Sequence, residues 1–118
     1  MDLEETLYRF NADLVRVIDG DTIVVLLDFG FEVYAERKLR LLNIDTPERS
    51  QPEYQAAIKF TKDKLTNKKL IIQTYKYDSI GRYLAEVFYK DNGEYYLLNE
   101  SLQKAGLYKP NSKWNVFY

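Results

Sequence analysis

Two acidic turns and one arginine carry most of the chemistry that this sequence offers. The first turn contributes Asp19 and Asp21, and the second contributes Asp45 and Glu48 after an apolar run that contains Arg40. Carboxylates from two turns can bind one hard cation, and an arginine can hold two oxygens of a phosphate. Metal-assisted attack on a phosphodiester needs these groups, so the pattern favours a calcium-dependent nuclease.

The composition narrows the possible chemistry further. The chain contains no Cys and no His, which excludes disulfides, thiol nucleophiles, thiolate metal sites and imidazole bases. Any metal site must then use oxygen ligands, which favours Ca²⁺ or Mg²⁺ over zinc or copper. The net charge of -1 argues against a general polyanion binder, so DNA or RNA would have to be bound through a local cluster of cations.

The length and polarity of the chain bound its organisation. With 118 residues, 46% of them hydrophobic and 30% charged, we expect one domain spanning residues 1–118, with the composition of an ordinary soluble globular protein. No apolar run approaches the roughly 18–20 residues that span a bilayer, so we expect no membrane partner. We also expect a monomer. The acidic N-terminus has no hydrophobic segment behind it, which predicts no signal peptide in this chain. A cytoplasmic protein of a bacterium, phage or mobile element, or the mature part of a secreted protein, both fit this pattern.

Runs of apolar and β-branched residues, separated by turn residues, predict the elements that must position the acids. Strands are expected over residues 7–18, 22–27, 32–44, 70–75, 83–89 and 95–98, and helices over residues 50–67 and 99–106. An Asp-Gly pair between the first two strands is a hairpin signal. This order fits a mixed α+β fold, a five-stranded Greek-key barrel of the OB type with two or more short helices.

Both helices have recognisable end signals. Ser50 and Glu53 have the spacing of a capping box at the start of the first helix. Asn99 is placed to cap the second helix, whose Ala105 we expect to face inward. Gly106 should end that helix, because glycine readily adopts the left-handed conformation found after a last turn.

Four short segments together resemble the staphylococcal nuclease (thermonuclease) family. They occur in the family's order and at nearly its spacing, and they define a core of about residues 7–110 with a C-terminal tail of residues 111–118. The segments are Ile18-Asp19-Gly20-Asp21-Thr22, Arg40-Leu41-Leu42-Asn43-Ile44-Asp45-Thr46-Pro47-Glu48, Asp78-Ser79-Ile80-Gly81-Arg82, and Leu98-Asn99-Glu100 with Ala105-Gly106-Leu107. The resemblance implies the OB barrel favoured above and Ca²⁺-dependent hydrolysis of DNA and RNA phosphodiesters that leaves 3′-phosphates.

The resemblance places a calcium site at the two acidic turns. The implied ligands are the carboxylates of Asp21 and Asp45 and the backbone carbonyl of Thr46, while Asp19 supports them without binding the cation. Because the two aspartates lie at the ends of different strands, a barrel can bring them to one cation, and Ca²⁺ tolerates an irregular set of oxygens. The alternative is that Asp19 and Asp21 only form a hairpin turn, which favours Asp and Gly.

The resemblance also implies that Glu48 is the general base and that Arg40 and Arg82 bind the phosphate, whose charge grows in the transition state. Each role has an alternative. Glu48 fits a helix-capping pattern that begins at Asp45, although the better capping box that follows makes that pattern redundant. Arg40 could form a structural ion pair, because burying a guanidinium in an apolar strand is unfavourable unless it meets an anion.

The region after Gly106 differs from the family's prototype. It is shorter, so Tyr108 is the one tyrosine there with a clear counterpart, and we assign it to substrate binding by base stacking, with packing as the alternative. Ser79 and Ile80 stand where the prototype has a lysine and a tyrosine, and the family's last helix has no counterpart beyond Pro110. The functional alternative is a non-catalytic nucleic-acid- or protein-binding barrel, which would typically lose the acids and arginines that this chain keeps.

Overall fold

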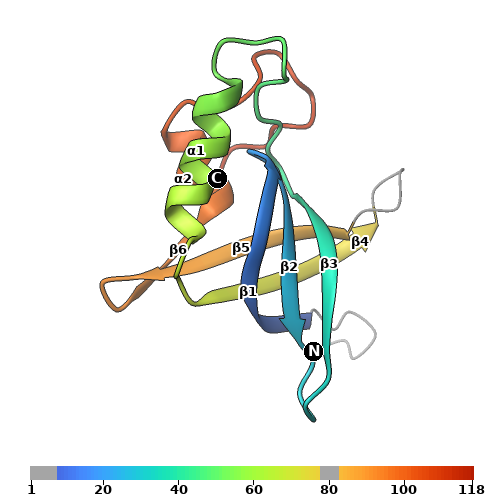
Figure 1. The fold of residues 1–118 in the computed structure, drawn as a ribbon. Helices are drawn as coiled ribbons and strands as arrows, with labels where there is room; N and C mark the ends of the chain where they lie inside the picture. The colour runs from blue at the N-terminus through green and yellow to red at the C-terminus, as the bar shows by residue number, and fades with distance from the viewer. Residues whose placement is uncertain (1–7, 78–82) are drawn as a thin grey trace.

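The computed structural model describes residues 8–77 and 83–118 (Figure 1). Its elements are β1 (Tyr8–Asp19), β2 (Thr22–Asp28), β3 (Tyr34–Leu41), α1 (Tyr54–Leu65), β4 (Leu70–Tyr77), β5 (Tyr83–Asp91), β6 (Glu94–Leu97) and α2 (Leu98–Lys104). β3 is shorter than predicted because residues 31–32 and 42–43 form turns, with Phe31, Glu32 and Asn43 at positive φ angles. Within the described ranges, no helix is long and apolar enough to cross a membrane.

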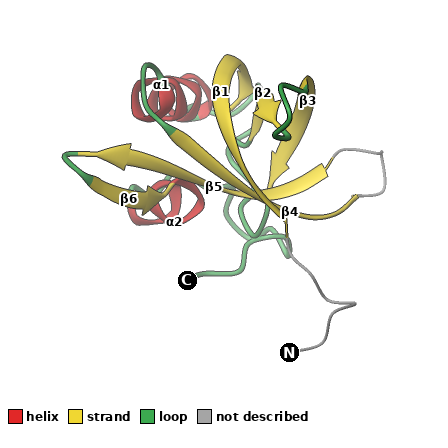
Figure 2. Cartoon of the chain, turned by 90° about the horizontal axis from the view of Figure 1, so that it is seen from below, coloured by secondary structure: helices red, strands yellow, loops and turns green. Residues whose placement is uncertain are grey.

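The six strands form one sheet in the order β3-β2-β1-β4-β5-β6. Neighbours in this order are antiparallel, and residues 39–41 of β3 also pair in parallel with residues 83–85 of β5. This last pairing closes β1 to β5 into a barrel, while β6 extends β5 as a hairpin (Figure 2). The predicted α+β architecture, an OB-type barrel of five strands with two helices, is therefore confirmed.

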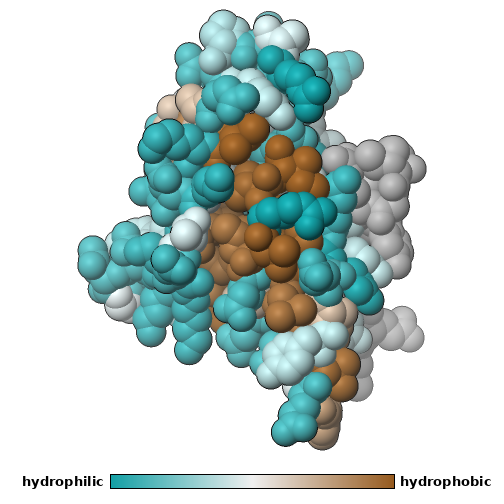
Figure 3. All heavy atoms as spheres, in the orientation of Figure 1, coloured by the Kyte–Doolittle hydropathy of each residue, from teal (hydrophilic) through white to brown (hydrophobic). Residues whose placement is uncertain are grey.

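Alternation along β2 shows how the sequence fills the barrel. Ile23, Val25 and Leu27 are all buried, as expected when every second side chain of a strand points to the same face. Further core residues come from β3, β4, β5 and both helices: Leu39, Leu41, Leu65, Leu70, Ile72, Ala85, Val87, Leu98 and Leu102. Burying such a side chain stabilises the fold by roughly 1.5–3 kcal/mol. On the face seen in Figure 3, hydrophobic side chains gather over the middle of the molecule and hydrophilic ones surround them.

The predicted capping box at the start of α1 is wrong. Glu53 occupies the N-cap position without a side-chain hydrogen bond to the helix, and Ser50 lies in a preceding turn. The reason lies in Gln51, whose side-chain oxygen accepts the N–H of Glu48 at 2.6 Å and whose N–H donates to the Glu48 carbonyl at 2.8 Å. The chain thus completes a closed turn after Glu48 before the helix begins.

The prediction that Asn99 caps α2 is also wrong, because Asn99 lies inside the helix and is fully buried. Its side-chain Nδ2 donates to the carbonyls of Leu42 and Ala85 at 2.8 and 3.1 Å. Its Oδ1 accepts the N–H of Val87 at 3.0 Å. Since an unpaired buried polar group is unfavourable, this fully bonded amide ties α2 to β5 and to the loop after β3.

The chain turns back toward the barrel after α2. Ala105 is exposed rather than inward, while Gly106 ends the helix at a φ of 74°, as predicted. The residues that follow run beside the loop after β3 (Figure 1). There the N–H of Val116 donates to the Asn43 carbonyl at 3.0 Å, so the last residues pack against the loop that carries the predicted acids.

Candidate active site

Strand register brings the predicted acids together at one end of the barrel. Asp21 lies in the turn between β1 and β2, and its neighbour Thr22 pairs with Arg40 across β2 and β3. The N–H of Leu41 donates to the Asp21 carbonyl at 2.8 Å, which joins this turn to the end of β3. Asp45 follows in the loop after β3, so all three charged side chains meet at the same edge.

The turn that carries Asp21 is pressed against α1, and Gly20 makes this possible. A Cβ atom at Gly20 would lie 2.7 Å from the Ala57 Cβ, too short for a real contact, and 3.0 Å from the Thr46 Oγ1, which is tighter than most real contacts. The Thr61 hydroxyl donates to the Gly20 carbonyl at 2.7 Å. α1 therefore holds the acidic turn in a fixed position relative to Thr46 and the loop after β3.

Arg40 is buried between the two aspartates. Its Nη2 lies 3.4 Å from Asp21 Oδ2 and 3.1 Å from Asp45 Oδ1. Its Nη1 donates to the carbonyls of Leu41 and Ile44 at 3.0 and 2.6 Å. The structural ion pair considered as an alternative is thus present. The same guanidinium brings the two carboxylates close together and is hydrogen-bonded to backbone carbonyls at the end of β3 and in the loop after it.

The two carboxylates have further partners but keep accepting capacity. Asp21 accepts the Thr46 N–H at 2.9 Å and the Thr22 hydroxyl at 3.0 Å, one on each oxygen. Asp45 accepts the Ser112 hydroxyl on Oδ2 at 2.8 Å. Because a carboxylate offers about four lone-pair sites, both side chains can still accept another donor or a cation.

Thr46 contributes an unusual atom to this region. Its Oγ1 is buried and has no hydrogen-bond partner in the part of the chain that the structure describes. The side chains of Asp21, Asp45 and Thr46 offer only oxygen atoms, the donor type that suits a hard cation such as Ca²⁺. No group of three or more acidic side chains within metal-binding reach occurs among residues 8–77 and 83–118, so other ligands would have to be backbone carbonyls, water or substrate.

Glu48 stands on the rim of a hollow of about 300 Å³ beside these acids. The residues that line it are Asp19, Asp21, Thr46, Pro47, Glu48, Arg49 and Tyr54. Glu48 is exposed, and its Oε1 accepts a hydrogen bond from the Lys109 ammonium at 2.6 Å. This bond raises the pKa of Lys109 above its usual value, against a smaller opposing effect of burial.

Asp19 lines the same hollow. Its Oδ1 accepts the Tyr54 hydroxyl at 2.7 Å. Because Tyr54 is the first residue of α1, this bond connects the acidic turn to the start of the helix. Helical spacing in the sequence places Tyr54 on the apolar face of α1, but it does not reveal which residue the Tyr54 hydroxyl contacts.

The remaining predicted residues lie differently. Arg82 is outside the described residues. Tyr108 is half-buried and packs against the hydrophobic core, and its ring meets that of Phe117 edge-on with centroids 4.9 Å apart. This position fits the packing alternative, and base stacking by Tyr108 stays a prediction.

Residues 109–115 supply site contacts that sequence reasoning missed. Besides Lys109 and Ser112, the Asn115 side chain accepts the Asp45 N–H at 2.7 Å, and the Trp114 indole lies over Arg40. These residues have no periodic pattern and belong to no helix or strand. The sequence shows a cluster of aromatic residues here, Trp114, Phe117 and Tyr118, but such a cluster does not indicate which residues it contacts.

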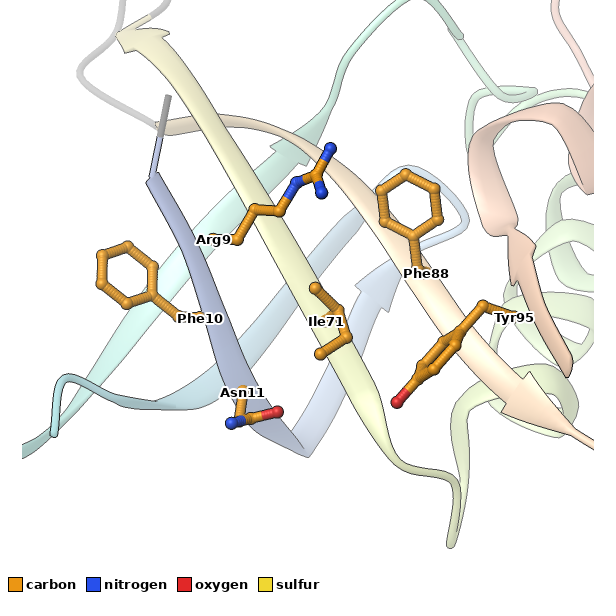
Figure 4. A pocket seen from close by; sticks show the side chains of 6 residues that line it. All are labelled: Arg9, Phe10, Asn11, Ile71, Phe88 and Tyr95. Carbon is orange, nitrogen blue, oxygen red and sulfur yellow. The ribbon is translucent and has the colours of Figure 1, made fainter. Parts of the chain in front are cut away.

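A second hollow, of about 410 Å³, lies on the outer face of β1, β4, β5 and β6 (Figure 4). Its lining residues are Arg9, Phe10, Asn11, Ile71, Phe88 and Tyr95. The Arg9 Nε donates to the Gln73 side chain at 2.6 Å. None of these lining residues carries a carboxylate, so this hollow lacks the acid–base and metal-binding groups that hydrolysis needs.

Comparison with known proteins gives one family. The family model described as staphylococcal nuclease homologue matches residues 38–116, which include the second half of β3, the loop with Asp45 and Glu48, and the segment that covers Arg40.

Individual relatives point the same way. A thermonuclease of Staphylococcus hyicus is 38% identical over 110 residues, covering 86% of this chain and 62% of that protein. A thermonuclease of Staphylococcus intermedius is 37% identical over the same shares. A protein of Escherichia coli O157:H7 named as an uncharacterized endonuclease is 32% identical over 99 residues, covering 81% of this chain and 58% of that protein. The chain thus spans about three fifths of the length of the relatives it matches.

Proposed function

The chain belongs to the staphylococcal nuclease homologue family, and on this premise we propose that it is a calcium-dependent nuclease that hydrolyses phosphodiester bonds of DNA or RNA. One observation carries the proposal. Arg40 holds the carboxylates of Asp21 and Asp45 together. Asp21 and the exposed carboxylate of Glu48 line the same hollow. This arrangement supports a site in which the cation ligands, the phosphate-binding arginine and the general base would lie near one another.

The calcium ion would be held by the carboxylates of Asp21 and Asp45 and by the Thr46 carbonyl. The oxygen-only donor set and the unpartnered Thr46 hydroxyl beside it fit such an ion. When bound, Ca²⁺ supplies charge neutralisation at the phosphate and places the attacking water. Asp19 would keep the acidic turn in position through its bond with Tyr54.

Glu48 would act as the general base that removes a proton from the water. Its present partner is Lys109, and both side chains are accessible to solvent, so exchanging this partner for water is energetically easy. Arg40 and Arg82 would bind the equatorial phosphate oxygens and stabilise the charge that develops there. An arginine stays protonated, so these two residues have an electrostatic role and the base must be Glu48.

The direct test is digestion of single-stranded DNA by the purified protein in Ca²⁺, in Mg²⁺ and in EGTA. The proposal predicts cleavage in Ca²⁺ that stops in EGTA, with 3′-phosphate ends on the products. Absence of cleavage in every metal, with DNA still retained in a binding assay, would instead support the alternative of a binding module without turnover.

Calcium binding is tested separately by calorimetry on Asp45→Asn. We expect this variant to bind Ca²⁺ roughly tenfold more weakly or worse, since it loses one charged ligand. Asp63→Asn is the matched control, because Asp63 is an exposed carboxylate on α1 that pairs with Lys59. Equal calcium affinity in both variants would contradict the assigned site.

A further inference from the structure

Trp114 covers the arginine of the candidate site. The Arg40 Cζ lies 5.2 Å from the centre of the indole ring, within the range of a cation–π contact. The indole Nε1 also donates to the Leu41 carbonyl at 3.4 Å. The ring is therefore attached to the end of β3 itself, one residue from the arginine that it covers.

The indole and the carboxylates contact different parts of the guanidinium. A guanidinium is planar and its N–H donors all point outward in that plane. The edge of Arg40 meets the carboxylates of Asp21 and Asp45 and two backbone carbonyls, whereas its central carbon lies over the face of the Trp114 ring. A cation–π contact of this kind restricts the movement of the guanidinium and uses none of its hydrogen-bond donors.

The same segment also holds Asp45. The Ser112 hydroxyl donates to the Asp45 carboxylate at 2.8 Å. The backbone of Asp45 is bound on both sides, since Asn115 accepts its N–H at 2.7 Å and the Lys109 N–H donates to its carbonyl at 2.6 Å. Two charged groups of the candidate site thus depend for their orientation on residues 109–115.

We propose that Trp114 is a positioning residue for Arg40. Through Trp114, the segment of residues 109–115 contributes to the active site. The proposal rests on the proposed function, because the orientation of Arg40 matters for the rate only if Arg40 binds the phosphate. It assigns to Trp114 the task of keeping the guanidinium plane aimed at the point where Asp21 and Asp45 meet.

The kinetic test compares Trp114→Leu with Trp114→Phe in the DNA digestion assay. Misplacing a group that stabilises the transition state lowers kcat, so Trp114→Leu should lose roughly tenfold or more in kcat with little change in KM. Trp114→Phe keeps an aromatic face and should recover most of kcat. An increase in KM without loss of kcat would show that Trp114 contacts the substrate instead, and would overturn the positioning role.

Tyr118→Leu is the matched control, because it removes another ring from the end of the chain. The Tyr118 hydroxyl donates to Glu86 at 2.8 Å and accepts from Asn43, and neither contact leads to Arg40. We expect this variant to lose thermal stability while kcat stays near that of the wild type. Equal losses of kcat in Trp114→Leu and Tyr118→Leu would mean that Trp114 has a purely structural role.

A readout without turnover separates this proposal from the nuclease assignment. The Arg40 side-chain N–H signal in an NMR spectrum, identified by its loss in Arg40→Met, should be shifted upfield by the indole ring current. Trp114→Leu should abolish that shift and Trp114→Phe should retain part of it. If the wild type does not cleave DNA but this pattern is found, only the nuclease assignment fails. If the Arg40 signal is the same in the wild type and Trp114→Leu, the positioning proposal is wrong whether or not the protein cleaves.

Discussion

Two kinds of ion pair lie at the same end of the barrel, and they differ in their surroundings. Arg40 lies 3.1–3.4 Å from its aspartates, with exposed side-chain fractions of 9% for Arg40, 10% for Asp21 and 26% for Asp45. Lys109 lies closer to Glu48, at 2.6 Å, but these side chains are 32% and 62% exposed. The shorter distance belongs to the weaker interaction, because solvent screens an exposed pair and does not reach a buried one.

The comparison separates two requirements of a hydrolytic site. The charges that must stay in place are on a strand end, in a turn and in a braced loop, where they are largely shielded from solvent. The carboxylate that must exchange a proton with water is on an exposed turn with a replaceable partner. We therefore predict that the buried guanidinium of Arg40 is essential to the fold and that the exposed carboxylate of Glu48 is essential to turnover alone.

The largest effect on stability is expected for Arg40→Met. Removing the guanidinium leaves two nearby carboxylates unpaired, and breaking such a buried pair typically reduces the free energy of unfolding by about 3–5 kcal/mol. Urea denaturation measures the change. Arg9→Met is the matched control, since Arg9 is an exposed strand arginine bound to Gln73, and it should stay close to the wild type. Similar losses in both variants would remove the contrast between buried and exposed charge.

A smaller loss of stability is expected for Gly20→Ala, which tests how firmly α1 holds the acidic turn. The added methyl group would lie 2.7 Å from the Ala57 Cβ, and overpacking of this kind lowers the free energy of unfolding by about 1–3 kcal/mol. The double variant Gly20→Ala with Ala57→Gly relieves that contact and should recover part of the loss. Thermal melting of the single and double variants measures both changes. No recovery in the double variant would contradict the close approach of Gly20 to Ala57.

The smallest effect is expected for Lys109→Met. The hydrogen bond to Glu48 raises the pKa of Lys109 above 10.5, so the pair stabilises the fold below pH 10.5 and loses that contribution as pH rises through the folded-state pKa. Because solvent screens this pair, its contribution is small, and the urea midpoint at pH 7 should lie only slightly below that of the wild type. A clear drop in the midpoint at pH 7 would show that the exposed pair is structural.

How much the sequence predicted follows the same division. Asp21, Arg40 and Asp45 were expected at one site because the family resemblance implies it and because a barrel can bring the ends of different strands together. Ser50 and Asn99 were misassigned because each fits a local capping pattern, which a competing local turn overrides at Ser50 and tertiary contacts override at Asn99. Gln51 closes a turn ahead of α1, and the Asn99 amide pairs with buried backbone groups instead of a helix end.

The contacts of the last residues could not be predicted at all. Ser112, Trp114 and Asn115 reach Asp45 and Arg40 across about 70 residues of sequence through single hydrogen bonds and one ring contact. No periodicity records such contacts, since each depends on where a loop happens to return. The roles assigned to Glu48, Arg82 and the calcium ligands stay predictions that the experiments above address.

The most direct test of the central claim measures unfolding and DNA cleavage together for Glu48→Gln. General bases contribute about 10²–10⁴-fold to a rate, so cleavage should fall by that amount while the urea midpoint stays at the wild-type value. Glu53→Gln, which changes an exposed carboxylate at the start of α1, should alter neither quantity. Wild-type cleavage by Glu48→Gln, or a loss of cleavage that follows a loss of stability, would contradict the division between a buried framework and an exposed base.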